Sequence, residues 1–316
     1  NNLFLRSYIM DPTLSLNGAE IGGIRGFFRS LQKICRELNP TKIIACWDGE
    51  GGSQKRRKIT KEYKEGRKPL KLNRSLSVLT EEQKKKNQMW QNMRVMEYLN
   101  ETPIIQFGFS GVEADDVISK VVQSDNLSDY KKIIVSADKD FWQLVTDDTI
   151  VYRPIGSQFV TKEFLLENEG IHPTNFALAR AIAGDKSDNL PGVPGAGLPT
   201  IAKRIPFLKE EKECSIMEIL DYAEKMCNES KIKFYPKIIE NNKLILKNYK
   251  MMQLKAPMLS AQTAIAIRRT LQEAEYKFNR TNFRAHMVKD GFDMEKNNFS
   301  ELFAFFNNIC LENKNK

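Results

Sequence analysis

The first half of the chain alternates between helical and strand-like patterns of apolar residues. Apolar side chains recur every three or four residues from Asn17 to Leu38, which predicts an amphipathic helix that Pro40 ends. Three short apolar runs predict buried strands at 43–47, 103–107 and 132–136. Helices are expected after the second and third runs, at 113–122 and 140–145. This alternation predicts an α/β fold with a mostly parallel sheet flanked by helices.

The second half of the chain is predicted to be helical. Beyond about residue 160 the strand-like runs disappear, and the expected helices are 173–183, 215–226, 234–253, 260–273, 282–289 and 299–309. A stretch rich in glycine and proline, Leu190–Pro199, interrupts them. We therefore predict an α/β core over 1–160 and an all-helical region over 161–316.

A basic insertion lies between the first two predicted strands. From Gln54 to Gln88 the chain carries 13 Lys or Arg residues against 4 Glu. Because connections between such elements are usually short, an insertion of this length at the edge of the sheet is expected to be functional. A solvated charged helix is the plainer explanation of the charge run taken alone.

Composition narrows the class of chemistry. The net charge of +9 favours a polyanionic partner, either nucleic acid or an acidic membrane surface, and no apolar run approaches the length of a membrane span. The 5 cysteines form no C-x-x-C pair, which predicts reduced thiols in the cytoplasm and excludes a zinc ribbon. With only His172 and His286 present, a histidine triad is excluded, and hydrolytic chemistry would depend on carboxylates.

Carboxylates cluster where a parallel sheet would place its carboxyl edge. They follow the predicted strands or open the next helix, at Asp48, Glu113, Asp115, Asp116, Asp138, Asp140, Asp185 and Asp188. Any one of them is more readily explained as a helix cap. Gathered together they would repel one another unless cations neutralised them, and hard divalent ions such as Mg²⁺ or Mn²⁺ prefer such oxygen ligands. A metal pair of this kind suits phosphodiester hydrolysis.

Four motifs occur in a characteristic order along the chain. They are Asp48 with Arg56-Arg57 and Tyr63-Lys64-x-x-Arg67, Gly-x-Glu-Ala-Asp-Asp ending at Asp116, Ser-x-Asp-x-Asp ending at Asp140, and Gly-Asp-x-x-Asp-Asn-x-Pro-Gly-Val from Gly184. Together they resemble the 5′ nucleases: flap endonucleases, the N-terminal nuclease domain of bacterial DNA polymerase I, and phage 5′ exonucleases. The resemblance covers roughly residues 1–205 and looks closest to the ribonuclease H type 5′ nucleases of T-even phages.

The resemblance implies a PIN-like nuclease core with a helical arch over about 54–100 and a helix–three-turn–helix element over about 173–205. It implies a 5′→3′ exonuclease and flap endonuclease that removes RNA primers or 5′ flaps in DNA replication. Its partners would be DNA and RNA–DNA hybrids with a 5′ end or flap, together with replication proteins such as a single-strand-binding protein or a sliding clamp. The chain is expected to be a monomer in the bacterial or phage-infected cytosol, away from membranes.

The resemblance also assigns roles to residues. Asp48, Glu113, Asp115, Asp116 and Asp138 would hold one Mg²⁺ or Mn²⁺, and Asp140, Asp185 and Asp188 a second. Lys64 and Arg67 would be catalytic, steadying phosphate charge, while Tyr63 would stack on a base or pack against the helix behind it. The implied DNA contacts are Arg56, Arg57, Lys84, Lys85, Lys86, Gly192, Gly195, Gly197, Lys203 and Arg204, with K⁺ at the glycine-rich turn.

Two departures from the family pattern leave alternatives open. The family has an aspartate at the tip of its first strand, whereas Asn1–Arg6 looks like the residues just after it, so a truncation is expected. Leu198-Pro199 stands where a lysine often occurs. The alternatives are the nuclease domain of a longer polymerase, or a non-catalytic binder of branched DNA if the whole gene lacks that aspartate. A PIN-type ribonuclease would lack the arch and the glycine-rich turn.

Overall fold

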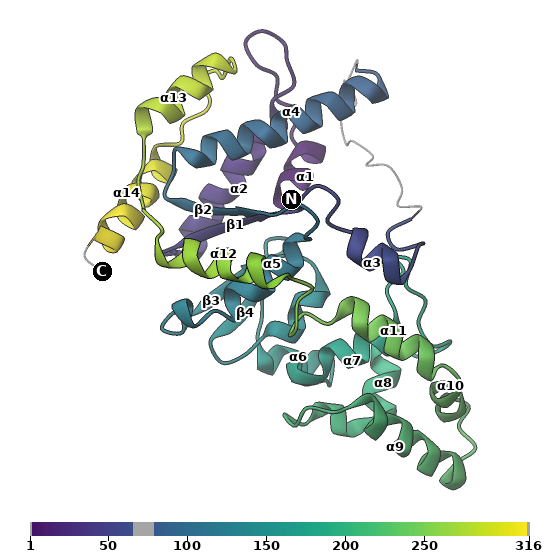
Figure 1. Cartoon of the computed structure of the whole chain (residues 1–316). Helices are drawn as coiled ribbons and strands as arrows, with labels where there is room; N and C mark the ends of the chain where they lie inside the picture. Colours follow the sequence, from purple (N-terminus) through teal and green to yellow (C-terminus); the bar gives the residue numbers. More distant parts are fainter. Residues whose placement is uncertain (1, 66–78, 315–316) are drawn as a thin grey trace. The chain divides into compact units, whose positions relative to one another are not determined.

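The structure, a computed structural model, describes residues 2–65 and 79–314 (Figure 1). The chain forms two compact units, each built from separate stretches of sequence. The first unit contains Asn1–Trp47, Pro69–Gly108 and Arg269–Lys316, and the second contains Asp48–Lys68 and Phe109–Arg268. The boundary expected near residue 160 lies inside the second unit.

The first unit packs helices around a parallel pair of strands. Its elements are α1 (Asn2–Met10), α2 (Gly22–Leu38), β1 (Ile43–Trp47), α4 (Glu81–Asn100), β2 (Ile104–Gly108), α13 (Arg280–Lys289) and α14 (Ser300–Lys314). β1 and β2 pair in parallel, with Ile43 opposite Ile104 (Figure 1). The rings of Phe28, Tyr98 and Phe283 contact one another in the core and join α2, α4 and α13.

The second unit contains the other strands and most of the helices. Its elements are α3 (Gln54–Ile59), α5 (Ala114–Val122), η1 (Asp125–Leu127), β3 (Lys132–Val135), η2 (Lys139–Leu144), β4 (Thr149–Arg153), β5 (Gln158–Val160), α6 (Lys162–Asn168), α7 (Pro173–Ala183), α8 (Leu198–Arg204), η3 (Pro206–Lys209), α9 (Ile216–Glu229), α10 (Phe234–Glu240) and α11 (Asn242–Met252). Helix α12 (Ala261–Gln272) spans the boundary between the units. β3 and β4 are parallel, and β5 is antiparallel to β4.

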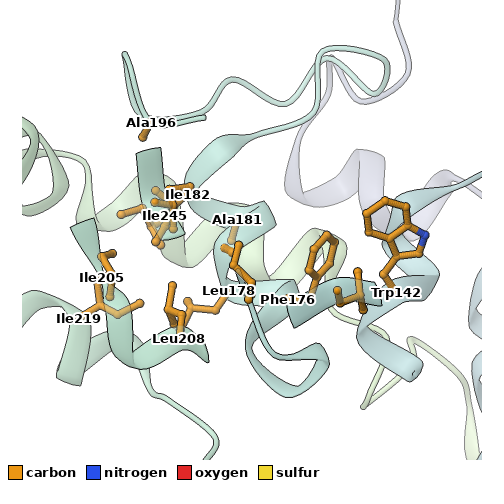
Figure 2. Close-up of a cluster of buried hydrophobic side chains, with 14 of the residues drawn as sticks. Trp142, Phe176, Leu178, Ala181, Ile182, Ala196, Ile205, Leu208, Ile219 and Ile245 are labelled. Carbon is orange, nitrogen blue, oxygen red and sulfur yellow. The ribbon is translucent and has the colours of Figure 1, made fainter. Parts of the chain in front are cut away.

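One hydrophobic cluster fixes the helices of the second unit. Trp142 of η2, Phe176 and Ile182 of α7, Ile219 of α9 and Ile245 of α11 are all buried in it (Figure 2). Burying side chains of this size stabilises a fold by roughly 1.5–3 kcal/mol each. The cluster therefore holds η2, which carries Asp140, and α7, which carries Arg180, in a fixed arrangement.

The α/β class and the helical second half are confirmed, with corrections to the elements. Within the described residues, the three predicted strands belong to two hydrogen-bonded sheets instead of one, and β4 and β5 were not predicted. The first predicted helix begins at Gly22, because residues 15–18 form a turn in which Gly18 has a φ of +80°. The helix expected over 234–253 is broken at Asn241 into α10 and α11.

The basic insertion contains α3, a turn up to Glu65, and α4 from Glu81. A capping box between Thr80 and Gln83 begins α4. Residues 66–78, including Arg67, lie outside the described residues. Along the described chain, no helix combines the length and apolar character that crossing a bilayer requires.

Candidate active site

All eight predicted metal-binding acids belong to the second unit, and several of them cap turns. Asp48 follows β1, and its Oδ1 accepts a hydrogen bond from the backbone N–H of Ala114 at 2.9 Å. Glu113 is the residue before α5, and Asp115 and Asp116 lie in its first turn. The cap thus ties the Asp48 carboxylate to the helix that carries the next three acids.

A second group of acids surrounds Arg180 of α7. The Oδ1 of Asp138 caps η2 by accepting from the N–H of Asp140 at 2.9 Å. Arg180 donates through Nε to Asp140 Oδ1 at 2.9 Å and through Nη2 to Asp185. Ser187 also donates to Asp185 through N–H and Oγ, at 2.7 and 2.6 Å. One half-buried guanidinium therefore joins acids from two sequence motifs.

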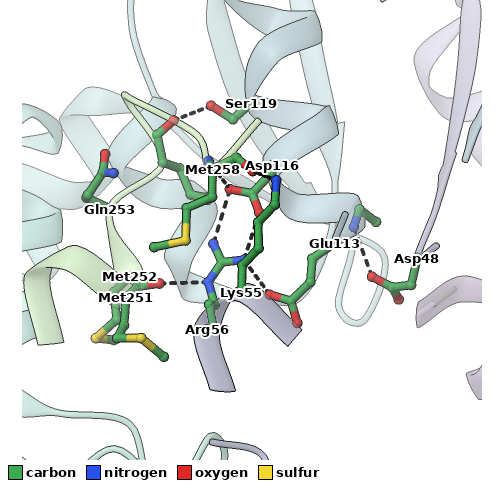
Figure 3. Close-up of polar contacts among 12 residues, drawn as sticks. Asp48, Lys55, Arg56, Glu113, Asp116, Ser119, Met251, Met252, Gln253 and Met258 are labelled. Carbon is green, nitrogen blue, oxygen red and sulfur yellow. Dashed lines mark hydrogen bonds and ion pairs between the residues drawn. The ribbon is translucent and has the colours of Figure 1, made fainter. Parts of the chain in front are cut away.

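Arg56 was predicted to contact DNA, but the structure places it in the interior. Its side chain is buried, with the residue only 4% exposed, and Nη1 forms ion pairs with Glu113 and, at 2.7 Å, with Asp116 (Figure 3). Its Nε donates to the carbonyl oxygen of Met251 at 2.9 Å. Burial opposes the charge, but the hydrogen bond and charge of Asp116 and the charge of Glu113 outweigh it and raise the Arg56 pKa. A guanidinium enclosed in this way cannot contact DNA.

Tyr63 and Lys64 also converge on Glu113. Tyr63 is buried against Leu190, Met251 and Met252, and its hydroxyl donates to Glu113 at 3.3 Å. The packing alternative for Tyr63 is thus the one found. Lys64 Nζ lies 2.5 Å from Glu113 Oε1, and its N–H donates to the Asp188 carbonyl at 3.1 Å. That second bond joins the turn of the insertion to the Asp185–Asp188 segment.

The acids influence one another electrostatically across the motifs. Burial raises the pKa of Asp115 to about 7, with the charges of Asp138, Asp48 and Glu113 adding to the effect and Lys64 opposing it. Burial also raises the pKa of Asp138, and the charges of Asp188 and Asp185 add to it, against Arg180. Burial raises the pKa of Asp140 to about 7, with the charges of Asp138 and Asp185 adding to the effect and Arg180 opposing it.

The Asp185 carboxyl is the exception among these acids. Its burial would raise the pKa, but the Ser187 hydrogen bond and the charge of Arg180 outweigh it, so the pKa is lowered. The four motifs thus bring their carboxylates into electrostatic range of one another.

The donor set matches a hard divalent cation in its chemistry. All the candidate ligands are carboxylates, the oxygen donors that Mg²⁺ and Mn²⁺ prefer. Within the described ranges, no three carboxylate, histidine or cysteine side chains are placed so that they could enclose one ion. Glu113, Asp116, Asp140 and Asp185 are instead paired with Arg56, Lys64 or Arg180. Some of these carboxylates would have to turn from their basic partners to bind a metal.

The glycine-rich loop joins α7 to α8, as predicted for the helix–three-turn–helix element. A Cβ on Gly192 would lie 1.9 Å from the carbonyl oxygen of Ala183, so this glycine is required by packing. Gly195 has a φ of +83° with open space beside it, and Gly197 precedes α8 with only Pro199 nearby. Lys203 is exposed and Arg204 is half-buried. Gly195, Gly197 and Lys203 are therefore the accessible part of this predicted DNA surface.

The other predicted DNA-binding residues lie at the two described ends of the insertion. Arg57 on α3 is exposed. On α4, in the first unit, Lys84 pairs with Glu81 and Lys86 with Glu82, and Lys85 is exposed. Exposed pairs of this kind contribute little, about 0–1 kcal/mol, so they do not prevent a phosphate contact.

Three residues that hold the site together, two of them buried and Arg180 half-buried, were not predicted. They are Arg180, Gln143, which donates to the carbonyls of Asp140 and Met252, and Asn248, which donates to those of Ala181 and Pro191. Arg180 could have been identified from the sequence, because it lies in the last helical turn before Gly184-Asp185. Gln143 and Asn248 had none, because their partners are far away in the sequence.

The amino-acid sequence is similar to those of known proteins. Residues 1–171 match the family model of the 5′-3′ exonuclease N-terminal resolvase-like domain. The 5′-3′ exonuclease of Aquifex aeolicus is 31% identical over 229 residues, 71% of either chain. DNA polymerase I of Bacillus subtilis is 31% identical over 209 residues, which cover 64% of this chain and 22% of the polymerase.

A solved structure has the same fold. The flap endonuclease of bacteriophage T5, in a pseudo-enzyme-product complex with DNA and metal ions, superposes with a TM-score of 0.62 over 79% of this chain and 90% of that one, at 19% identity. The narrower placement among T-even phage nucleases stays a prediction. By the family model and by its identity to the bacterial relatives, the chain belongs to the 5′-3′ exonuclease family.

Proposed function

We propose that the chain is a structure-specific 5′ nuclease that hydrolyses phosphodiester bonds in DNA and RNA–DNA hybrids at a 5′ end or flap. The observation that carries the proposal is the contact network that joins acids of four separate motifs: Asp48 accepts from the first turn of α5, Lys64 joins Glu113 to the Asp188 carbonyl, and Arg180 joins Asp140 to Asp185. Membership of the 5′-3′ exonuclease family supports the polarity, and the T5 flap endonuclease, which was crystallised with DNA and metal ions, supports the substrate class.

Two Mg²⁺ or Mn²⁺ ions are proposed as cofactors. Asp48, Asp115 and Asp138 would hold the first, with Glu113 near it, and Asp140, Asp185 and Asp188 would serve the second. Such ions lower the pKa of bound water and stabilise charge at phosphorus. The surrounding protein supplies orientation, because capping by Ala114 N–H and Asp140 N–H fixes the Asp48 and Asp138 carboxylates.

The basic residues are proposed to bind and orient the substrate. Lys64, whose side chain is 18% exposed beside Glu113, would steady phosphate charge. Arg67 is given the same role by its motif alone. Gly195, Gly197 and Lys203 would contact duplex phosphates, with K⁺ bound by carbonyls of that turn. We also propose that the protein removes primers or flaps and acts with replication partners. It is further proposed to be a monomer in the cytoplasm.

The test separates catalysis from binding. Asp140→Asn should reduce Mg²⁺-dependent cleavage of a 5′-flap substrate far more than it reduces affinity for that substrate in Ca²⁺. The reason is that the substitution removes a ligand charge in the second unit and leaves the exposed basic residues in place. Equal losses of cleavage and of affinity would contradict a catalytic role for this acid.

A second candidate places the same activity in a longer protein. The similarity to DNA polymerase I covers 22% of that enzyme, the share expected of a nuclease domain within it. Polymerase sequence downstream in the same gene would support this candidate, and a stop codon near Lys316 would reject it.

A further inference from the structure

We propose that Arg56 and the segment Met251–Met258 form a buried clamp that positions the acids of α5, and that Asp116 belongs to this clamp instead of to the metal ligands. The inference rests on the proposed function and assigns Arg56 and Asp116 as positioning residues. We call Met251–Met258 the strap, because it runs on from the last two residues of α11 and passes beside three elements of the site.

Each of the three nitrogens of the Arg56 guanidinium donates a hydrogen bond to a neighbouring residue. Its Nε donates to the strap at Met251 O (2.9 Å), Nη1 pairs with Glu113 and with Asp116 Oδ2, and Nη2 reaches Asp116 Oδ1 at 3.2 Å (Figure 3). A planar fork reaches its three partners from three separate nitrogens fixed in one plane, whereas an ammonium group has a single nitrogen on a flexible stem. Arg56 therefore sets the position of Glu113 and Asp116 relative to the strap.

Both oxygens of Asp116 already accept hydrogen bonds. Oδ1 accepts from Met258 N–H at 2.9 Å and from Arg56 Nη2, and Oδ2 accepts from Arg56 Nη1 at 2.7 Å. The residue is 2% exposed. The adjacent Asp115 accepts no hydrogen bond from the described residues and lies near the charges of Asp138 and Asp48. Asp116 is therefore already held by three protein donors, whereas the Asp115 carboxylate is held by no donor of the described residues and stays available to a metal.

The strap also anchors the segments that carry the other acids. Ser119 of α5 donates to the carbonyl of Leu254. Gln143 of η2, buried at 3% exposure, accepts from Leu254 N–H at 2.7 Å and donates to Met252 O at 3.0 Å and to Asp140 O at 2.7 Å. Lys55 of α3 donates to Met258 O at 2.7 Å. The strap thus fixes the positions of α3, α5 and η2 relative to one another.

A simpler role for Arg56 would be to cancel negative charge. The two roles predict opposite changes in metal affinity. If Arg56 only repels cations, removing it should tighten metal binding, since two buried carboxylates lose their counter-charge. If it positions α5, removing it should weaken metal binding, as the loss of outer supporting contacts usually does by about 10- to 100-fold.

The experiment measures Mn²⁺ binding to the full chain by calorimetry without DNA, and single-turnover flap cleavage at saturating Mn²⁺. Arg56→Met and Arg56→Lys should both weaken Mn²⁺ binding by about tenfold or more. Asp116→Asn should also weaken binding but keep most of the cleavage rate at saturating Mn²⁺, whereas Asp115→Asn should lose both.

Three results would overturn the proposal. They are tighter Mn²⁺ binding by Arg56→Met, wild-type binding by Arg56→Lys, and loss of the saturating rate in Asp116→Asn as complete as in Asp115→Asn. If Arg56→Met does not fold, Ser119→Ala removes only one anchor of the strap, and unchanged Mn²⁺ affinity in that variant would count against the clamp.

Two controls separate positioning from general destabilisation. Ile219→Val, in the hydrophobic cluster, should lower the melting temperature without changing Mn²⁺ affinity. Arg57→Met, on the exposed side of the same helix, should lower DNA affinity in Ca²⁺ and leave Mn²⁺ binding intact. Absence of flap cleavage by the wild type would reject the proposed function alone, because the calorimetry decides the clamp independently.

Discussion

At the scale of single residues, a carboxylate in this site often serves as both a cap and a candidate ligand. Asp48, Asp138 and Asp185 each use Oδ1 to accept a backbone N–H at 2.7–2.9 Å. Capping and metal binding are therefore compatible explanations of the same aspartate. The cap fixes the orientation of the carboxyl group before any cation arrives, and such preorganisation is what tight coordination needs.

A prediction at this scale concerns Lys64. Its ammonium group lies 2.5 Å from Glu113, which Arg56 also neutralises, so Lys64→Ala should leave the fold intact. We expect the single-turnover cleavage rate to fall by about 100-fold, the scale of losing one contact to developing charge. Rapid-quench kinetics would measure it, with Lys61→Ala on the same exposed turn as the comparison. An unchanged rate would leave Lys64 with only the structural contact to Glu113.

At the scale of elements, the glycine-rich loop combines two different requirements. Gly192 is needed for packing, because its Cα faces the Ala183 carbonyl at the end of α7, whereas Gly195 is needed for its positive φ. Gly197 has neither constraint and lies at the start of α8. A substitution at an unconstrained, accessible glycine can therefore test contact with a ligand without lowering the stability of the fold.

A prediction for the loop compares substitutions at these three glycines. Gly192→Ala should cause the largest loss of stability of the three, and Gly195→Val should cost at least about 1–2 kcal/mol through its left-handed backbone. Gly197→Ala should keep the free energy of unfolding near that of the wild type and reduce affinity for blunt duplex DNA, because a methyl group would hold the backbone away from phosphate. Urea unfolding and duplex binding in Ca²⁺ would measure both quantities. Wild-type affinity in Gly197→Ala would exclude a backbone contact there.

The basic start of α4 provides a second prediction for an element. Among the described residues Lys84 and Lys86 form ion pairs with exposed glutamates, and Lys85 is exposed, so all three lysines can reach phosphate. Replacing them with alanine should reduce the salt slope for a single-stranded 5′ flap by up to about 2, at roughly 0.7 for each contact. Blunt duplex should hardly change. Equal losses on both substrates would contradict the division of the DNA between arch and loop.

At the scale of the whole molecule, the fold gathers acids that repel one another. Burial and the neighbouring carboxylates raise the pKa of Asp115 to about 7 and raise that of Asp138, so concentrating these groups in the second unit opposes folding. The hydrophobic cluster around Trp142 and Phe176 offsets that cost. A divalent cation bound only by the folded state would add to stability.

The corresponding prediction concerns thermal unfolding. Adding Mn²⁺ or Ca²⁺ at about 100 times its dissociation constant should stabilise the protein by about 2.7 kcal/mol, and EDTA should reverse the effect. Tetramethylammonium chloride at equal ionic strength serves as the control for screening, because K⁺ is itself proposed to bind the glycine-rich turn. Asp115→Asn together with Asp138→Asn should abolish the response to the divalent ion. A shift that persisted in this double variant would place the cation elsewhere.

Local patterns in the sequence were sufficient for much of this protein. The apolar runs at 43–47 and 132–136 predicted β1 and β3 nearly to the residue, since short buried strands have a distinctive composition. The motifs identified the family, and the eight acids that they contain all lie in the second unit. In each of these cases the signal lies within about ten consecutive residues.

The tertiary structure decided what each polar residue contacts. Arg56 and Arg57 are adjacent in one basic run, yet Arg56 is buried between Glu113 and Asp116 while Arg57 is exposed. Burial of Arg56 depends on Met251, which is 195 positions away in the chain. Charge patterning shows only that a cation is present. Which anion neutralises it is settled when distant segments pack together, because burying a charge is favourable only where a partner is already in place.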